Sequence, residues 1–167
     1  MSSTLHPPSR IFLFRHAKAG WAEPGGRDFD RALTDEGFVQ AELVTDMAAD
    51  RGYRPGLVVS STALRCRQTA DAVRRAFDAE LEFRYVDELY NCPADVYLEI
   101  LGEIGDPRPL MFVGHNPAME ELLTHLTGID SATSHIPSGF PTAGLAVLDR
   151  ADASAPSPFV IADFLTA

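Results

Sequence analysis

Two histidines and two arginines in this chain have the chemistry needed for phosphoryl transfer, and each stands at or just beyond the end of a short apolar run. They are Arg15 and His16 after Ile11-Phe12-Leu13-Phe14, Arg65 soon after Leu57-Val58-Val59, and His115 after Leu110-Met111-Phe112-Val113 and Gly114. A neutral imidazole is a nucleophile near neutral pH, and a guanidinium group binds phosphate oxygens bidentately. The four residues therefore predict a site that binds a phosphate group and attacks it.

The apolar runs explain how residues so distant in sequence would meet. Short apolar runs bounded by turn residues are typical of buried strands in a parallel sheet, and such sheets bind ligands beyond the carboxyl ends of their strands. Arg65 falls in the first turn of an expected helix, where a cation opposes the helix dipole, and a bound anion would resolve that conflict. His115 precedes another helix whose free N–H groups favour an anion, although each histidine alone could equally be structural.

The pattern between these runs alternates strands with helices and predicts an α/β fold, a three-layer α/β/α sandwich with a mostly parallel central sheet. Further strands are expected over 81–86, 145–148 and 159–162, with one of the last two antiparallel at a sheet edge. Helices are expected over 35–50 with Thr34 as N-cap, from Ser61 or Thr62 to about Phe77, over 94–104, and from Asn116-Pro117 to about Thr127. Residues 21–30 and 129–141 read as loops, the first of them passing the mouth of the site.

Bulk composition limits the possible partners. The chain has 167 residues and 46% hydrophobic content, which suits a single domain over residues 10–167 behind a flexible leader over residues 1–9. Fourteen Lys and Arg against 24 Asp and Glu give a net charge of -10, which argues against nucleic acid or a membrane as partner. No apolar stretch is long enough to span a bilayer and no signal peptide is apparent, so a cytoplasmic protein with two reduced cysteines, Cys66 and Cys92, is expected.

The motifs together resemble those of the histidine phosphatase superfamily, the phosphoglycerate-mutase-like fold, and specifically its small SixA-type phosphohistidine phosphatases. The resemblance runs from about Ile11 to the last strand. The segments that carry it are Leu13-Phe14-Arg15-His16-Ala17, Arg31-Ala32-Leu33-Thr34 with Gly37, Ser60 through Ala70, Glu88-Leu89-Tyr90, Val113-Gly114-His115-Asn116-Pro117 and Pro141-Thr142-Ala143-Gly144.

The resemblance implies a role for each of the four residues. His16 would be the nucleophile that forms a phosphohistidine intermediate, Arg15 and Arg65 would bind the phosphate, and His115 would donate to the transferring phosphoryl group. No cofactor or metal is implied. Five histidines without a short-spaced pair or a neighbouring carboxylate pattern also argue against a zinc site.

The proton donor departs from the pattern of the superfamily. Many members carry a glutamate at the position that Asn91 holds here. Glu88 and Asp87 are the nearest carboxylates, and for each the catalytic reading and that of a solvated acid are both open. A protonated phosphoimidazole leaves as neutral imidazole, whereas an ester must expel a poor alkoxide, so the departure favours a P–N substrate.

The expected function is thus a phosphatase acting through His16 on phosphohistidine in a signalling or phosphotransfer protein. The short length of the chain supports a protein substrate, because few residues remain to form a lid over a metabolite. Two alternatives stay open: a phosphatase for a small phosphate ester, and a non-catalytic phosphate-binding module. A mutase would need a more closed pocket.

Several other polar residues are expected to have ordinary roles. Asp28, Asp30 and Arg31 read as loop ion pairs, although they could orient the pocket. Lys18 and Trp21 could take part in recognition or could be a solvated lysine and a packed indole. Arg67, two positions after Arg65 on a helix, is expected to point away from the site. The three remaining histidines, His6, His125 and His135, are expected on loops or a helix face.

Overall fold

The computed structural model describes residues 7–77 and 80–167. The first six residues of the expected leader, which include His6, lie outside this part of the chain. Residues 7–9 lead into the sheet, and the Arg150 guanidinium donates to the carbonyl oxygens of Pro7 and Pro8.

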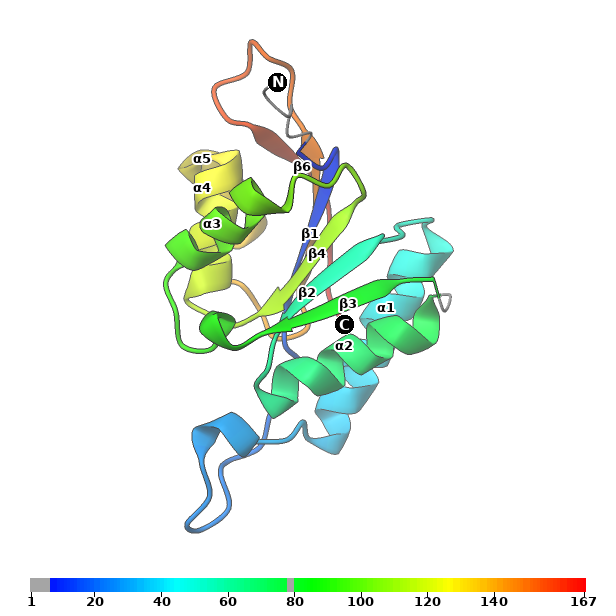
Figure 1. Cartoon of the computed structure of the whole chain (residues 1–167), viewed down its shortest axis with the longest axis vertical. Coiled ribbons are helices and arrows are strands. Elements are labelled where there is room, and N and C mark those ends of the chain that lie inside the picture. The colour runs from blue at the N-terminus through cyan, green and yellow to red at the C-terminus, as the bar shows by residue number, and fades with distance from the viewer. Residues whose placement is uncertain (1–6, 78–79) are drawn as a thin grey trace.

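Six strands form one mixed, mostly parallel sheet with the order β3-β2-β4-β1-β5-β6. Strands β1, β2, β3 and β4 run parallel, as the apolar runs predict. Their carboxyl ends therefore lie at one edge of the sheet (Figure 1). The strands are β1 (Arg10–Arg15), β2 (Leu57–Ser61), β3 (Glu82–Val86), β4 (Leu110–Gly114), β5 (Leu145–Arg150) and β6 (Phe159–Leu165).

The place of the antiparallel strand differs from the expectation. β5 pairs antiparallel with both β1 and β6, so it lies inside the sheet and β6 forms the edge. The short turn between β5 and β6 reverses the chain, and that reversal returns β6 to the direction of β1. Strand polarity was predictable from the short connection, but the side of β1 on which the hairpin docks was not.

Helices cover both faces of the sheet and complete the three layers (Figure 1). α1 and α2 pack on one face over a core that includes Phe12, Phe14 and Val58. The other three helices pack on the opposite face over a core around Tyr97 and Phe112. The helices are α1 (Asp35–Asp50), α2 (Leu64–Ala76), α3 (Ala94–Ile104), α4 (Ala118–Thr127) and α5 (Ile129–His135).

The start of α1 follows directly from its sequence. The Thr34 hydroxyl accepts from the Gly37 amide as an N-cap, and Asp35 and Glu36 complement the helix dipole in the first turn. Gly37 is needed for close packing, because a Cβ there would lie 2.0 Å from the carbonyl oxygen of Lys18. The helix is thereby held against the segment that follows β1.

Three local expectations were wrong. The N-cap of α2 is Ala63 and not Ser61 or Thr62, because the Ser61 hydroxyl accepts from the Ala63 amide within the preceding turn. α4 begins at Ala118 after a cis Asn116–Pro117 bond, and the Asn116 side chain donates to Phe140 O rather than capping the helix. The segment 129–141 contains α5, whose short length and polar residues hid it.

A short 3-10 turn, η1 (Asp28–Asp30), interrupts the expected loop over 21–30, and a second, η2 (Asp87–Leu89), follows β3. Both lie at the carboxyl edge of the sheet. Within the described residues, no helix combines the length and apolar character required to cross a membrane.

Candidate active site

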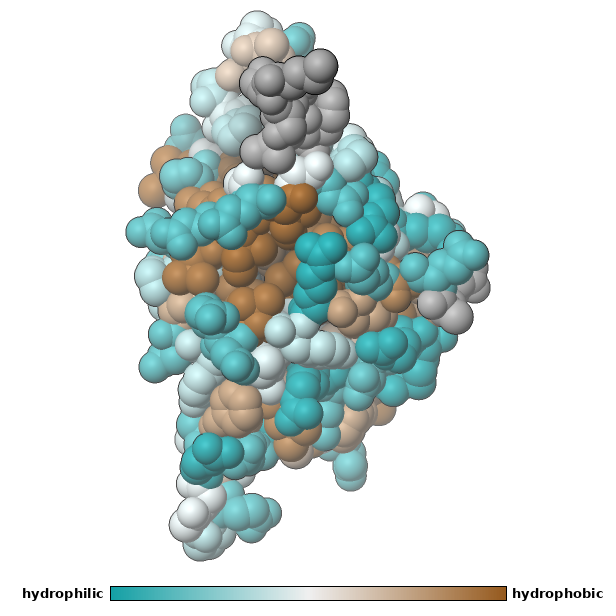
Figure 2. All heavy atoms as spheres, viewed as in Figure 1, coloured by the Kyte–Doolittle hydropathy of each residue, from teal (hydrophilic) through white to brown (hydrophobic). Residues whose placement is uncertain are grey.

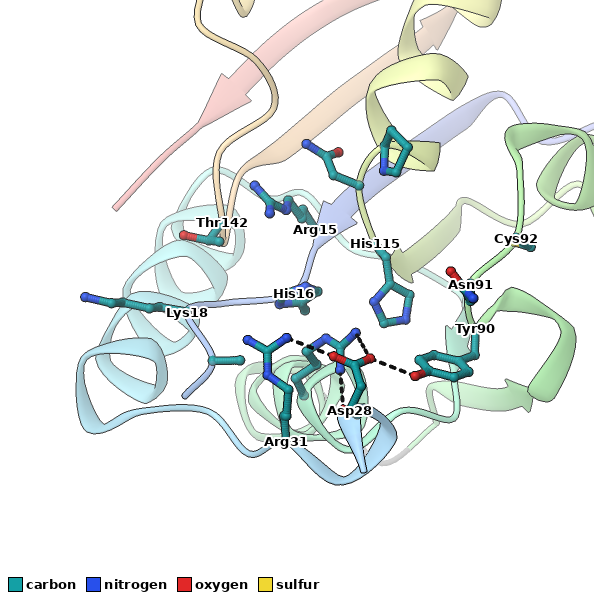
Figure 3. A pocket seen from close by; sticks show the side chains of 14 residues that line it. Arg15, His16, Lys18, Asp28, Arg31, Tyr90, Asn91, Cys92, His115 and Thr142 are labelled. Atoms are coloured by element: carbon teal, nitrogen blue, oxygen red, sulfur yellow. Dashed lines mark hydrogen bonds and ion pairs between the residues drawn. The ribbon is translucent and has the colours of Figure 1, made fainter. Parts of the chain in front are cut away.

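The carboxyl edge of the sheet carries a cavity of about 350 Å³ into which the four predicted residues converge. Arg15 and His16 come from the end of β1, Arg65 from the first turn of α2, and His115 from the residue after β4. All four line the cavity, and Figure 3 shows His16 and His115 pointing into the same space. The four side chains therefore meet at the carboxyl edge of the sheet, as predicted from the apolar runs.

The main chain fixes His16 from two sides. Its amide donates to Gly114 O at 3.0 Å, and its carbonyl oxygen accepts from the Ala143 amide at 3.1 Å. The next amide, that of Ala17, donates to the Thr69 hydroxyl of α2. These bonds tie the nucleophile position to β4, α2 and the segment before β5.

A single hydrogen bond determines which nitrogen of His16 can attack. Nδ1 lies 2.8 Å from Ala17 O, and a carbonyl oxygen only accepts, so Nδ1 carries the proton and Nε2 keeps its lone pair. His16 is 8% exposed. Burial, followed by the nearby His115, Arg65 and Arg15 side chains, lowers the pKa of His16 to about 3, so the ring is neutral at neutral pH.

His115 is held beside it in a similar environment. Its ring lies edge-on to that of His16 at a centroid distance of 5.4 Å, and its Nε2 lies 2.9 Å from the Ser61 hydroxyl. The buried Cys66 thiol approaches the same nitrogen at 3.4 Å. Burial and then the charge of Arg65 lower the pKa of His115 to about 4, which keeps this imidazole neutral too.

Both arginines line the cavity, and each has a buried Nε–H group without a hydrogen-bond partner among the described residues. Arg15 Nη1 donates to Phe140 O at 2.7 Å, whereas its Nε is buried without a partner among the described residues. The Arg65 side chain is 8% exposed, and its Nε likewise has no partner in this part of the chain. A guanidinium group keeps its charge even when it is buried, so both side chains place positive charge at the wall of the cavity, where it favours an anion.

Asp28 enters the site, contrary to the expectation of an ordinary loop ion pair. Its Oδ1 does pair with Arg31 at 3.0 Å, but its Oδ2 also accepts from Tyr90 Oη at 2.7 Å and from Arg65 Nη2 at 3.2 Å. The hydrogen bond from Tyr90, followed by that from Arg31, holds the pKa of this carboxyl far below its usual range. The carboxylate is therefore ionised at any ordinary pH.

The two carboxylates proposed as proton donors lie elsewhere. Glu88 and Asp87 belong to η2, are exposed, and are not among the residues that line the cavity. Asn91 does line it, in the left-handed conformation at φ 58°, a region that asparagine adopts more readily than most residues. Among the described residues, Asp28 is the acid that borders the cavity.

Lys18, Trp21 and Arg67 differ in whether they line the cavity. Lys18 lines the cavity and pairs with Glu36 at 2.6 Å. Trp21 is 93% exposed and is not packed as expected. Arg67 donates to Thr62 O and does not line the cavity.

The two cysteines are free thiols, as expected, with Cys66 buried and Cys92 at the cavity wall. Burial raises the pKa of Cys66 to about 12, so it remains a thiol. His125 and His135 lie exposed on α4 and α5. No group of three or more His, Cys, Asp or Glu in the described ranges is arranged to hold a metal ion.

Sequence reasoning gave no specific role to several lining residues. Asp28, Tyr90, Asn116 and Thr142 all border the cavity. Tyr90, Asn116 and Thr142 lay within the segments that resembled a known family. Asp28 lay outside those segments and was considered only as a residue that could orient the pocket, because its contacts depend on how the loop folds back over α2.

Comparison with known proteins agrees with this geometry. The sequence profile of the histidine phosphatase superfamily (branch 1) matches residues 11–97. A crystal structure from Agrobacterium tumefaciens, provisionally assigned as the phosphohistidine phosphatase SixA, is 48% identical to this chain. It superposes with a TM-score of 0.89, over 96% of this chain and 99% of that one.

Two curated relatives carry no assigned function. An uncharacterized protein of Mycobacterium tuberculosis is 34% identical over 139 residues, which are 80% of this chain and 85% of that protein. An uncharacterized chloroplastic protein of Arabidopsis thaliana is 29% identical over 129 residues, 71% of this chain but only 59% of that longer protein. The match thus spans less than two thirds of the plant protein.

Proposed function

This chain belongs to the histidine phosphatase superfamily and has its phosphoglycerate-mutase-like fold, and from that premise we propose that it removes phosphate from phosphohistidine in a protein. The observation that carries the proposal is the His16 imidazole, which is neutral and buried with Nε2 free, in a cavity that the Arg15 and Arg65 side chains also line. A nucleophile and an anion site share one cavity.

The first half of the reaction is attack on phosphorus. Arg15 and Arg65 bind the phosphate oxygens, and His115 donates to the phosphoryl group once it is bound. His16 Nε2 forms a bond to phosphorus as the bond to the leaving group breaks. The proton on Nδ1 stays there, and Ala17 O accepts from it throughout, so the imidazolium of the intermediate is stabilised.

The second half is hydrolysis of this intermediate. Water attacks phosphorus, the P–Nε2 electron pair returns to His16, and the product leaves as dihydrogen phosphate with both protons of the water. His16 is then restored as the neutral Nδ1–H tautomer. No additional acid is needed, because the leaving nitrogen belongs to an already protonated ring.

Two features support a protein-borne P–N substrate. The position where many members of the superfamily hold a glutamate is Asn91, and the one acid at the cavity among the described residues is the ionised Asp28. A leaving alkoxide would lack a proton donor, whereas neutral imidazole needs none. The structure assigned provisionally as a phosphohistidine phosphatase is also nearly half identical to this chain.

The proposal is tested with a substrate panel on the purified protein. We expect phosphate release from a phosphohistidine-carrying protein to be faster than release from simple phosphate monoesters. Rapid ester hydrolysis with the phosphohistidine protein left intact would support the small-ester alternative and overturn the proposal.

Trapping of the intermediate separates an enzyme from a binding module. With labelled phosphohistidine protein and rapid acid-free quenching, label is expected to appear covalently on the wild type and to be absent from His16→Ala. His16→Ala should also abolish turnover with the fold intact. Label bound only non-covalently to the wild type would support a phosphate-binding module.

A further inference from the structure

Asp28 has no role in the mechanism above, yet three residues hold its carboxylate in place at the cavity wall. Tyr90 donates to Oδ2 at 2.7 Å, Arg65 donates to Oδ2 at 3.2 Å, and Arg31 donates to Oδ1 at 3.0 Å. These partners come from three different segments, after η2, on α2 and after η1. Figure 3 shows the carboxylate between Arg31 and Tyr90, with His16 and His115 across the cavity from it.

The carboxylate remains partly accessible from the cavity. The Asp28 side chain is 51% exposed, in contrast to Arg65 at 8%. An ionised carboxylate has about four lone-pair positions, and the three side-chain donors leave capacity for another. A substrate group with an N–H could therefore reach it.

Its charge state excludes one role and favours another. The hydrogen bond from Tyr90 and then that from Arg31 keep the pKa of Asp28 very low, so it holds no proton to donate. An ionised carboxylate instead accepts hydrogen bonds and stabilises a nearby cation. A protonated phosphoimidazole offers both, because its unphosphorylated ring nitrogen carries an N–H and the ring carries positive charge.

We propose that Asp28 contacts the leaving group. Its carboxylate accepts a hydrogen bond from the N–H of the substrate imidazole ring and thereby selects phosphohistidine over phosphate esters. The inference rests on the proposed function and adds the basis of its specificity. Tyr90 holds the carboxylate toward the cavity, and the Tyr90 ring also lies edge-on to His115 at 5.8 Å.

The bond changes balance without an external acid. The substrate ring enters with a proton on one nitrogen and phosphorus on the other. His16 Nε2 bonds to phosphorus, the P–N bond of the substrate breaks, and its electron pair returns to the substrate ring. The ring leaves as neutral imidazole, still donating its N–H to Asp28, and the positive charge passes to the His16 ring.

The surroundings of Asp28 set the pH dependence expected of this step. Arg65 and Arg31 face the carboxylate as cations, and Tyr90 faces it as a neutral hydrogen-bond donor. The charge of Asp28 also acts on His115 and raises the pKa of that histidine, against the lowering by burial. Arg15 lies across the cavity. Because the carboxylate stays ionised, it raises the pKa of the bound substrate ring and keeps that ring protonated to higher pH.

The test compares Asp28→Asn with wild type on two substrates, phosphoimidazole and p-nitrophenyl phosphate. Losing a charge-assisted acceptor is expected to lower kcat/KM for phosphoimidazole by roughly tenfold or more. The nitrophenolate leaving group has no N–H, so its kcat/KM should change far less. The alkaline limb of the kcat profile with phosphoimidazole should move to lower pH in the variant.

Asp30→Asn is the matched control on the same turn. Asp30 pairs with Arg27 at 3.0 Å and does not line the cavity, so both substrates should keep their wild-type rates. Tyr90→Phe supplies a second variant if Asp28→Asn does not fold, because it releases the carboxylate while keeping its charge. It should show the same selective loss.

The outcomes separate this inference from the proposed function. Equal losses on both substrates, with an unmoved pH profile, would mean that Asp28 only positions Arg65, and the inference would be overturned. A wild type that cleaves the ester but neither phosphoimidazole nor a phosphohistidine protein would instead overturn the proposed function.

Discussion

At the scale of single residues, the location of one proton decides what the cavity can do. Ala17 O accepts from His16 Nδ1 and leaves Nε2 unprotonated. Burial then keeps both His16 and His115 neutral, with pKa values of about 3 and 4. The Nε2 lone pair of His16 is therefore available without a general base to deprotonate the ring.

These pKa values predict the titration of the two imidazoles. A histidine with a lowered pKa stays neutral until the pH falls to that lower value, so neither ring should gain a proton between about pH 7.5 and pH 5. NMR shifts of the ring C–H groups, assigned with His16→Asn and His115→Asn, should stay constant over that range. A transition near the ordinary histidine pKa in either ring would contradict the buried, neutral site.

The Arg65 guanidinium predicts a large effect on rate. Arg65→Ala should lose on the order of 2 to 4 kcal/mol of transition-state stabilisation, as other removed charge-stabilising donors do. Measured kcat/KM checks this, with Arg67→Ala as the matched control from the same helix, since Arg67 donates to Thr62 O outside the cavity. A loss confined to thermal stability would place Arg65 in a structural role.

Residue types predicted which histidines and arginines line the cavity, but they did not predict which acid borders it. His16 and Arg15 follow a strand-like run, so their location was determined by the sheet. Asp28 depends on a loop that folds back over α2, and no short-range pattern encodes that approach. Glu88 was favoured by nearness in sequence, yet the 3-10 turn that carries it leaves it exposed outside the cavity lining.

At the scale of elements, the junctions between strands and helices position the site. β1, β2 and β4 end at Arg15, Ser61 and Gly114, and each passes directly into a segment that supplies a lining residue or a partner of one. Strand periodicity and turn residues predicted these elements well. The start of α4 and the presence of α5 were missed, because Asn116 bonds to Phe140 O and the α5 sequence is polar.

Gly114 offers a test of the junction after β4. A Cβ at this position would lie 2.0 Å from Tyr97 Oη on α3, so Gly114→Ala must push that helix or the following His115 aside. We expect a loss on the order of 1 to 3 kcal/mol of unfolding free energy, as for other overpacked sites, together with reduced kcat. Chemical denaturation and steady-state kinetics measure the two effects.

Gly102→Ala is the control for that substitution. Nothing lies within 4 Å of a Cβ placed there, and the residue sits within α3. Alanine should raise the unfolding free energy by about 0.5 to 1 kcal/mol and leave kcat unchanged. Full activity and stability in Gly114→Ala would show that α3 yields easily and does not hold His115 in place.

At the scale of the whole molecule, an acidic protein concentrates positive charge in one cavity. The net charge is -10, yet Arg15, Lys18, Arg31 and Arg65 all border that cavity. Anions are therefore repelled by most of the surface and bound at one place.

This charge distribution predicts stabilisation by a phosphate analogue. Tungstate should raise the thermal midpoint of the wild type, by an amount equivalent to about 2.7 kcal/mol at a concentration 100 times its Kd. Arg65→Ala should lose most of the shift, and added salt should reduce it only weakly because the site is buried. An undiminished shift in Arg65→Ala would place the anion elsewhere on the protein.

The central position of β1 has a consequence for how the chain is made. Its Arg10 pairs with Asp149, 139 positions further along, so the strand that carries the nucleophile is synthesised long before its neighbour β5. At about 5 to 20 residues per second, the ribosome needs roughly 7 to 28 s to reach that partner. Throughout that interval the β1 backbone groups that later pair with β5 form an open strand edge, which makes the nascent chain a natural client for chaperones.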